Sequence, residues 1–210
     1  MCGIFGYVSK NKEPVNLATL RQIAAQTMTR GPHAWGLAWV AKNGLLKTYK
    51  QQGRIVDSLA LLSMVEGSTM LIGHCRWATH GSPELNANNH PHDAGDAWVV
   101  HNGVIHDYEW IAREHGLSLT TQCDSEVISA LIKKFRGKPM TRAVKTVRET
   151  MGRSPFAMMA LWPDRLIASA TNGQPLHVGE TRSAYYLASL GDGLPGCVSE
   201  FNEGEIVEYA

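Results

Sequence analysis

Residues 69–81 read TMLIGHCRWATHG, an apolar run typical of a strand that leads directly into a polar loop. The end of this run gathers a guanidinium, an indole, a hydroxyl and two imidazoles, those of Arg76, Trp77, Thr79, His74 and His80. A guanidinium suits bidentate capture of a carboxylate. The simpler alternatives are a solvated charge at Arg76 and a core side chain at Trp77, but the density of polar groups favours a binding site.

Strand patterns lie on both sides of a helical middle section. They cover residues 3–9, 36–41, 45–50, 69–76, 97–105, 156–162, 165–170, 175–179, 184–189 and 205–209. Helical patterns cover residues 17–29, 55–65, 108–115, 125–136 and 141–151, with Asn16, Asp107, Asp124 and Thr141 at the starts of four of them. Asn43-Gly44 and Asn172-Gly173 indicate tight turns. Consecutive hairpins imply antiparallel sheets, so the order predicts an α+β fold.

The composition is that of an ordinary globular protein, with 44% hydrophobic and 19% charged residues. Lys and Arg total 20 against 19 Asp and Glu, so neither a nucleic acid nor a membrane surface is expected as a partner. No apolar run is long enough to span a bilayer, and the N-terminus lacks a secretory signal. Four scattered cysteines without a CxxC pair favour a cytoplasmic protein with reduced thiols. No linker divides the chain, so we expect one domain over residues 1–210, or 2–210 without Met1.

Cys2 directly follows Met1, and its chemistry depends on whether that methionine is removed. Small second residues generally permit the removal, which places the α-amino group of Cys2 next to its own thiol. An α-amino group has an ordinary pKa of about 7.7–8.0, which suits a general base near neutral pH. A terminal amine that activates its own side chain is an established form of nucleophilic catalysis. The alternative is a small buried thiol on a terminal strand.

Asn102-Gly103 and Asp124 can each be interpreted in two ways, as part of a reactive site or as an ordinary structural feature. Asn102 and Gly103 follow an apolar strand, and an Asn amide with a Gly N–H can form an oxyanion hole. The alternative there is a tight turn. Asp124 can hold a substrate ammonium group or cap the following helix, and a cap leaves one carboxylate oxygen free for the other role.

Histidines are concentrated in the middle of the chain. The six in this region are His74, His80, His90, His92, His101 and His106. Imidazoles suit zinc and other transition metals, but no HExxH motif occurs. We therefore expect no functional metal, and a zinc-dependent hydrolase remains the alternative.

Several motifs occur together in an order typical of one family. They are the Cys-Gly-Ile-Phe-Gly start, Arg30-Gly31, GHCRWATHG, NNHPH, VVHNGVI and CDSEVI. In this combination the chain resembles the class II glutamine amidotransferases, which are N-terminal nucleophile hydrolases, and within them the glutaminase domain of glucosamine-6-phosphate synthase. The resemblance covers residues 2–206, nearly the whole chain. It implies a four-layer αββα sandwich of two antiparallel sheets.

The resemblance also implies a reaction. Cys2 corresponds to the nucleophile and its free amine to the base, while Asn102 and Gly103 correspond to the oxyanion hole. The implied reaction hydrolyses the side-chain amide of L-glutamine through a γ-glutamyl thioester, releasing ammonia and then glutamate. No cofactor is implied.

Substrate binding is implied in the same way. Arg76 corresponds to the ligand of the glutamine α-carboxylate, and Asp124 to the partner of the α-amino group. The remaining residues of the implied site are Trp77, Thr79 and His80 of the glutamine-binding loop and the supporting residue Arg30.

The chain departs from the family pattern at three positions. The family usually has an Asp shortly after Arg-Gly, whereas this chain has Pro32-His33, which removes a carboxylate from the surroundings of Arg30. Cys75 and Cys123 stand where the related domain commonly has threonine.

The sequence also ends where the related glutaminase domain ends, so we expect no acceptor domain on this chain. A separate acceptor protein for the ammonia is then implied. Two alternatives remain open: a free-standing hydrolase of another γ-glutamyl amide, and a non-catalytic regulatory subunit.

Overall fold

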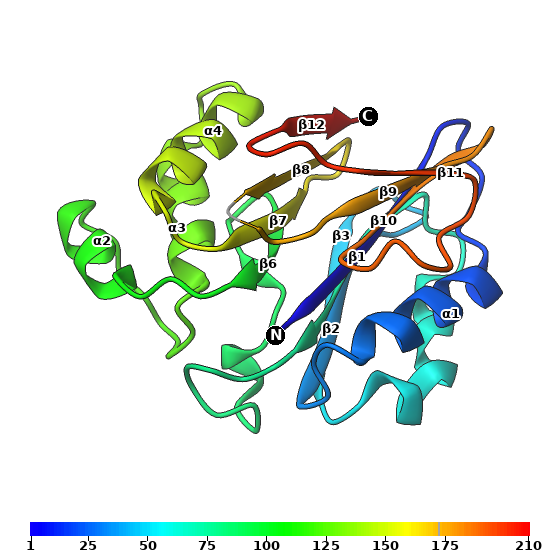
Figure 1. The fold of residues 1–210 in the computed structure, drawn as a ribbon, viewed down its shortest axis with the longest axis horizontal. Coiled ribbons are helices and arrows are strands. Elements are labelled where there is room, and N and C mark those ends of the chain that lie inside the picture. The colour runs from blue at the N-terminus through cyan, green and yellow to red at the C-terminus, as the bar shows by residue number, and fades with distance from the viewer. Residues whose placement is uncertain (172) are drawn as a thin grey trace.

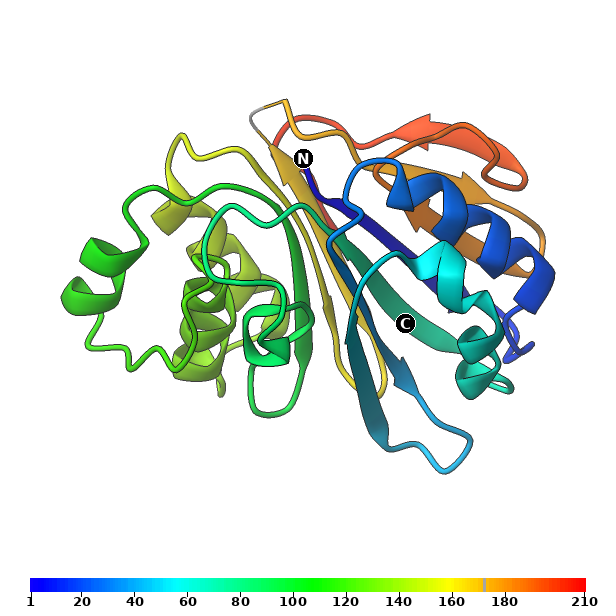
Figure 2. The same ribbon diagram turned by 90° about the horizontal axis from the view of Figure 1, so that it is seen from below.

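Two antiparallel sheets pack face to face, and helices cover the outer face of each (Figure 1). The computed structural model describes residues 1–171 and 173–210. The turn expected at Asn172 lies outside the described residues. Figure 2 shows the four layers edge on, with α2, α3 and α4 on one side and α1 with η1 on the other. The α+β class and the four-layer αββα arrangement are confirmed.

The first sheet has seven strands in the order β11-β9-β10-β1-β4-β2-β3. Their bounds are β1 Gly3–Ser9, β2 Ala34–Val40, β3 Leu46–Gln52, β4 Met70–Arg76, β9 His177–Glu180, β10 Ala184–Ala188 and β11 Cys197–Glu200. The central pair is β1 with β4, in a register that sets Gly3 opposite Cys75. This register brings the first residues of the chain beside the polar loop that follows Arg76.

The second sheet has five strands in the order β12-β8-β7-β6-β5. Their bounds are β5 His92–Asp93, β6 Trp98–Gly103, β7 Phe156–Leu161, β8 Leu166–Thr171 and β12 Ile206–Tyr209. In β6, Gly103 is opposite Phe156 of β7, so β6 ends beside the start of β7.

Side chains of β1 alternate between two cores. Ile4 and Val8 belong to the core between the sheets, whereas Phe5 and Tyr7 belong to the core beneath α1 and η1. This period of two is the expected pattern for a strand buried on both faces. It explains why the first strand contains almost no polar side chain.

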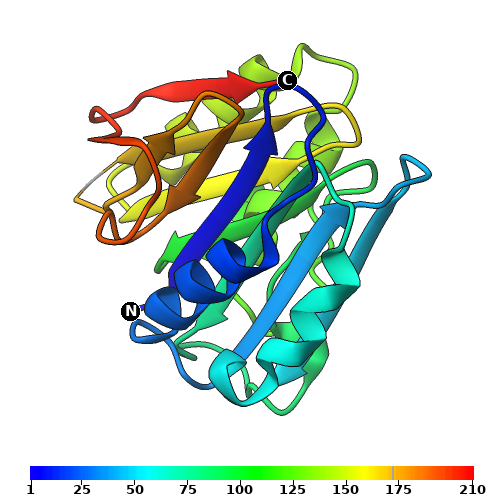
Figure 3. The ribbon, with the colours of Figure 1, turned by 90° about the vertical axis from the view of Figure 1, so that its right-hand side faces the viewer.

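The observed helices agree with the predicted helical segments in position, but not all of the predicted caps form. Their bounds are α1 Leu17–Met28, η1 Ile55–Val65, η2 Asn86–Asn88, α2 Tyr108–Glu114, α3 Glu126–Phe135 and α4 Met140–Met151. Asn16 caps α1 as predicted, because its Oδ1 accepts the Thr19 N–H at 3.0 Å. Figure 3 shows α1 and η1 side by side on the outer face of the seven-stranded sheet.

Residues 55–65 are helical as predicted, in the 3-10 form and with a break at Ser58, whose φ of −134° lies outside the helical region. Other local details differ from the sequence patterns. The Asp107 side chain makes no capping bond to α2, and α4 begins at Met140. The strands β5 and β11 were not predicted: β5 has two residues, and every residue of β11 is exposed, so neither shows a hydrophobic pattern. No helix within the described ranges is long and apolar enough to cross a membrane.

Candidate active site

Cys2 lies immediately before β1, near the end of the sandwich where the N-terminus is marked (Figure 1). Its Sγ accepts a hydrogen bond from the Trp77 N–H at 3.3 Å. Burial raises the pKa of the Cys2 thiol, while the Trp77 N–H, the terminal amino group and the Arg76 charge lower it. Since burial is the largest of these effects, the thiol is mostly protonated near neutral pH and needs a base to become a nucleophile.

The Cys2 side chain lines a cavity of about 350 Å³. The other residues around it are Met1, Trp77, Thr79, Asn102, Gly103, Val104, His106, Pro155 and Gln174. They come from the chain start, the loop after β4, the end of β6 and three later loops, so only the folded chain assembles the cavity. Its volume is within the range of small-molecule sites in proteins.

Asn102 is buried at the end of β6, and its amide nitrogen Nδ2 has no hydrogen-bond partner among the residues described. An unpartnered buried donor costs about 1–3 kcal/mol, and an oxygen bound in the cavity would satisfy it. Both Asn102 and Gly103 belong to a strand, so the turn considered as their alternative is not what forms.

Gly103 cannot be replaced without strain. Its φ is +153°, and a Cβ atom would lie 1.9 Å from the carbonyl oxygen of Pro155. The absence of a side chain therefore lets the backbone of Gly103 approach Pro155 while lining the cavity.

Arg76 is the last residue of β4 and is only 2% exposed, so it is not a solvated surface charge. Its Nη1 donates to Asn89 Oδ1 at 2.8 Å, and its Nη2 donates to the carbonyl oxygens of Gly81, at 3.1 Å, and His80. All three acceptors are neutral, and none of the ion pairs in the described residues includes Arg76. A buried guanidinium without a carboxylate partner suits an anionic ligand.

Trp77 and Thr79 extend from Arg76 to the cavity. The Trp77 side chain is 46% exposed, so it is not a core residue. Both residues line the cavity beside Cys2, whereas Arg76 does not. The loop after β4 therefore runs from Arg76 to the cavity that contains the Cys2 thiol.

Asp124 is buried, and its carboxylate does not cap α3. Its Oδ2 accepts the main-chain N–H of Ile105 at 2.7 Å, and its Oδ1 lies 3.8 Å from Nδ1 of His80. The helix begins only at Glu126. The capping role expected at Asp124 was wrong because the N–H of Ile105, distant in sequence, takes the oxygen that a helix N–H would use. Oδ1 faces His80, on the loop that also covers Arg76.

Arg30 holds the backbone behind the nucleophile. Its Nε donates to the carbonyl oxygen of Cys2 at 2.7 Å, and burial lowers the pKa of its guanidinium. At the next residue, a Cβ on Gly31 would lie 2.5 Å from the backbone of Arg76, so glycine allows the end of α1 to pack against β4.

His33 lies near the position where the family usually has a carboxylate. Its Nδ1 accepts the Ala78 N–H at 3.1 Å, and its ring centroid lies 4.9 Å from that of Trp77. The histidine therefore supports the loop after β4, whereas Arg30 is held through its own bond to Cys2.

The structure arranges the nine sequence-predicted residues in two adjoining groups. Cys2, Trp77, Thr79, Asn102 and Gly103 line the cavity, and Arg30 lies behind Cys2. Arg76, His80 and Asp124 form a second group next to it. Sequence reasoning missed Asn89 and Gln174, and it noted His33 only as a departure from the family pattern. Asn89 lies in the NNHPH segment, whose motif assigns no role to its asparagines; nothing local marks Gln174.

Curated proteins of known name are similar to this chain. The chain is 36% identical over 197 residues to the glutamine–fructose-6-phosphate aminotransferase [isomerizing] of Aquifex aeolicus, covering 90% of this chain and 32% of that protein. It is 35% identical over 221 residues to the protein of the same name from Pseudomonas putida, covering 99% and 35%. The chain thus spans about a third of the length of these curated relatives. No protein-family model matches it.

Solved structures share the fold at lower identity. The glutamine phosphoribosylpyrophosphate amidotransferase of B. subtilis, complexed with ADP and GMP, superposes with a TM-score of 0.74 at 22% identity, over 99% of this chain and 49% of that chain. A glutamine aminotransferase class-II domain protein from Silicibacter pomeroyi superposes with a TM-score of 0.62 at 15% identity, over 99% and 94%. Together with the relatives and the shared motif order, this fold identifies the chain as a class II glutamine amidotransferase domain.

Proposed function

We propose that the chain hydrolyses the side-chain amide of L-glutamine to glutamate and ammonia, with Cys2 as the nucleophile. One observation supports this assignment above the others. The Cys2 thiol and the unpartnered amide of Asn102 line the same cavity, which pairs a nucleophile with a free donor for the developing oxyanion.

The reaction requires removal of Met1, which itself lines the cavity. The freed α-amine of Cys2 takes the thiol proton, and Sγ attacks the amide carbon of glutamine. Asn102 Nδ2 and the Gly103 N–H stabilise the tetrahedral oxyanion. The protonated amine then gives its proton to the departing nitrogen. Ammonia is released, and a γ-glutamyl thioester remains on Cys2. Water attacks the thioester with the amine again as base, releasing glutamate and restoring the thiol.

Substrate orientation follows from the second group of residues. Arg76 binds the α-carboxylate of glutamine, since its charge has no carboxylate partner in the described chain. Asp124 binds the α-ammonium group through Oδ1, the oxygen that Ile105 leaves free. Trp77, Thr79 and His80 position the loop between the two charges. Fixing both charged groups on the α carbon of the amino acid directs its side-chain amide towards Cys2.

The proposal extends to the fate of the ammonia. The curated relatives are about three times longer and are named as aminotransferases that use fructose 6-phosphate. We propose that ammonia from this domain passes to an acceptor outside residues 1–210, on a separate protein. The four free cysteines support a reducing, cytoplasmic location.

The test is glutamate release from L-glutamine by purified protein, with the intact mass recorded to establish that the chain begins at Cys2. The Cys2→Ala variant is expected to lose all activity. The matched control is Cys197→Ser, because Cys197 is an exposed free thiol on β11 and should not contribute.

The alternatives give different results in the same assay. A marked preference for a larger γ-glutamyl amide, still dependent on Cys2, would change the substrate but keep the mechanism. Activity that survives in Cys2→Ala and disappears with a chelator would favour a zinc hydrolase. Inactivity of a correctly processed chain towards every γ-glutamyl amide would favour a non-catalytic subunit.

A further inference from the structure

Buried imidazoles form a continuous stack beside the proposed glutamine site. The rings of His74 and His90 stack with centroids 3.9 Å apart, and the His92 ring meets His90 edge-on at 4.5 Å. All three side chains are at most 3% exposed. Neither His90 nor His92 has a role in the glutamine chemistry, so their burial requires another explanation.

The polar atoms of these two rings are not satisfied by the described residues. Both ring nitrogens of His90 and Nε2 of His92 are buried without a hydrogen-bond partner there. An unpartnered buried polar atom costs about 1–3 kcal/mol, and native proteins keep few of them without a functional reason. Three such atoms on two adjacent rings indicate a missing ligand.

The Cys123 thiol lies close to the rings of His90 and His92. It lies just before α3 and is 2% exposed, and its Sγ is 3.8 Å from Asp124 Oδ1, which is a long hydrogen bond. One ring nitrogen of His90, one of His92 and Sγ of Cys123 lie within 4.8 Å of one another. Ligand atoms on one tetrahedral zinc ion lie about 3.3–3.6 Å apart, given Zn–N and Zn–S bonds of about 2.0 and 2.3 Å. Small side-chain rotations close this difference.

We propose that His90, His92 and Cys123 bind one divalent transition-metal ion of the zinc type. Two imidazoles and a thiolate are the ligands that zinc prefers, whereas magnesium and calcium require oxygen ligands. Binding displaces the thiol proton of Cys123 to solvent and forms a sulfur–metal bond, with no change in oxidation state. A water molecule occupies the fourth position.

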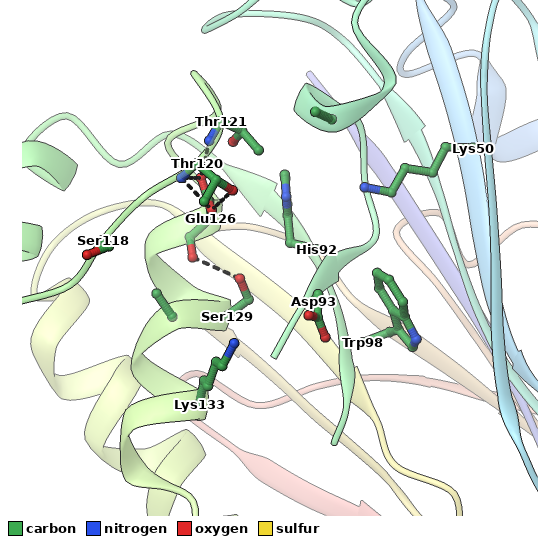
Figure 4. Close-up of a pocket in the computed structure, with 12 residues that line it drawn as sticks. Lys50, His92, Asp93, Trp98, Ser118, Thr120, Thr121, Glu126, Ser129 and Lys133 are labelled. Atoms are coloured by element: carbon green, nitrogen blue, oxygen red, sulfur yellow. Dashed lines mark hydrogen bonds between the residues drawn. The ribbon is translucent and has the colours of Figure 1, made fainter. Parts of the chain in front are cut away.

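A second cavity provides the route for the ion. It has a volume of about 340 Å³ and lies between β3, β5 and α3, and His92 is part of its wall. Figure 4 shows Lys50 reaching towards His92 from one side, with Glu126 and Asp93 also around the cavity. An ion entering here reaches His92 first, without passing Cys2 or Asn102.

The charges around the group are of both signs. Lys50 and Arg76 oppose a cation, and burial lowers the pKa of Lys50 to about 8, so near neutral pH it still carries most of its charge. Asp124, Asp93 and Glu126 favour a cation, and the Cys123 thiolate adds a further negative charge.

The test uses cobalt(II), because a cobalt–thiolate bond gives a charge-transfer absorption that a cobalt–imidazole bond does not. The parent is the full chain with Cys2→Ser and Cys197→Ser, which removes the two accessible thiols. Cys123→Thr and Cys75→Thr are compared in that parent. Both remove a buried free cysteine, but the Cys75 side chain lies in the core under α1, on the opposite face of β4 from the side chain of His74.

We expect the parent and the Cys75→Thr variant to take up one cobalt ion per chain, with the charge-transfer band, and to exchange it for zinc. Cys123→Thr is expected to lose the band and to bind zinc at least about tenfold more weakly. Circular dichroism and thermal unfolding without metal establish that all three proteins are folded, and added zinc should raise the melting temperature only where Cys123 is present.

Absence of cobalt uptake by the folded parent would overturn the proposal, as would a charge-transfer band that persists in Cys123→Thr. If Cys123→Thr is unfolded, His92→Gln in the same parent replaces it, with the same expected weakening of zinc binding. None of these measurements depends on glutamine hydrolysis.

Discussion

Arg30 donates a hydrogen bond from Nε to the carbonyl oxygen of Cys2 at 2.7 Å. The bond joins the end of α1 to the residue just before β1, so the helix fixes the position of the proposed nucleophile. A charged donor of this kind contributes about 1.5–3 kcal/mol when its partner is buried.

Replacing Arg30 with lysine keeps the charge but removes the Nε donor. We expect kcat for glutamine to fall about tenfold to 100-fold, because a nucleophile displaced by about 1 Å reacts far more slowly, while KM stays nearly constant. The control is Arg21→Lys, since Arg21 also donates from Nε to a carbonyl oxygen, that of Leu59, away from Cys2. Equal losses in the two variants would contradict a specific role for Arg30.

Asn102→Ala tests the proposed oxyanion hole. Loss of one oxyanion donor is expected to lower kcat by about 10²–10³ with little effect on KM. The free energy of unfolding should not fall by the usual amount for a buried polar residue, because Nδ2 has no hydrogen-bond partner in the described chain to lose. Steady-state kinetics and urea unfolding measure the two effects. A large loss of stability with unchanged kcat would mean that the amide is structural.

Gly103→Ala is expected to destabilise the fold by at least about 1–3 kcal/mol from backbone strain, and further through overlap with the Pro155 carbonyl oxygen. Gly116→Ala is the matched control. Gly116 also has a positive φ, of +57°, but nothing lies within 4 Å of its added Cβ. Urea unfolding of both variants should therefore separate backbone strain from steric overlap, and equal losses would contradict the overlap.

Asp124→Asn removes the charge while Oδ1 of the asparagine can still accept the Ile105 N–H. We expect KM for glutamine to rise about tenfold to 100-fold, the equivalent of one lost charged hydrogen bond of about 1.5–3 kcal/mol. Thermal stability should change little. Asp107→Asn, at an exposed position before α2, is the control. A KM unchanged by Asp124→Asn would exclude a contact with the substrate ammonium group.

The lowered pKa of the Glu126 carboxyl leads to a prediction of how the stability of the fold depends on pH. Burial by itself raises the pKa of its carboxyl, but hydrogen bonds from Thr120 and Thr121 outweigh this and hold the pKa below its ordinary value of 4.5. A carboxyl with a lowered pKa in the folded state contributes stability above pH 4.5, and the contribution disappears as the pH falls through the lowered pKa.

Glu126→Gln should therefore lower the melting temperature at neutral pH and lose this difference from the wild type in acid, below the lowered pKa. Melting temperatures measured from about pH 7 to about pH 3 provide the comparison. Glu149→Gln, at an exposed position on α4, should show no such convergence. A constant difference between wild type and Glu126→Gln at every pH would contradict the prediction.

Local patterns predicted the elements whose signals lie within a few residues. The Asn16 cap fixes the start of α1 through the Thr19 N–H, and Asn43-Gly44 marks the connection between β2 and β3. These signals are reliable because donor, acceptor and turn residues are neighbours in the chain. The exposed strand β11 was not recognised, because edge pairing rather than local propensity determines it.

In the candidate site, too, the sequence predicts the residues but not the tertiary contacts that hold them. The order of the motifs along the chain points to all nine residues of the proposed glutamine site. The motif order does not reveal that the Ile105 N–H donates a hydrogen bond to Asp124. Nor does it reveal that Arg76 donates a hydrogen bond to Oδ1 of Asn89. These partners are 19 and 13 residues away in the sequence, and no periodicity relates them.

The amino-acid sequence therefore settles the residue types, most of the strand and helix patterns and the family, because these depend on short-range propensity and on motifs read in order. Folding in three dimensions decides which groups remain without a partner among the described residues: Nδ2 of Asn102, both ring nitrogens of His90 and Nε2 of His92. Whether a buried polar atom has a partner depends on every chain segment that packs against it. For this reason the glutamine site can be recognised from the sequence, whereas the proposed metal site emerges only in the folded chain.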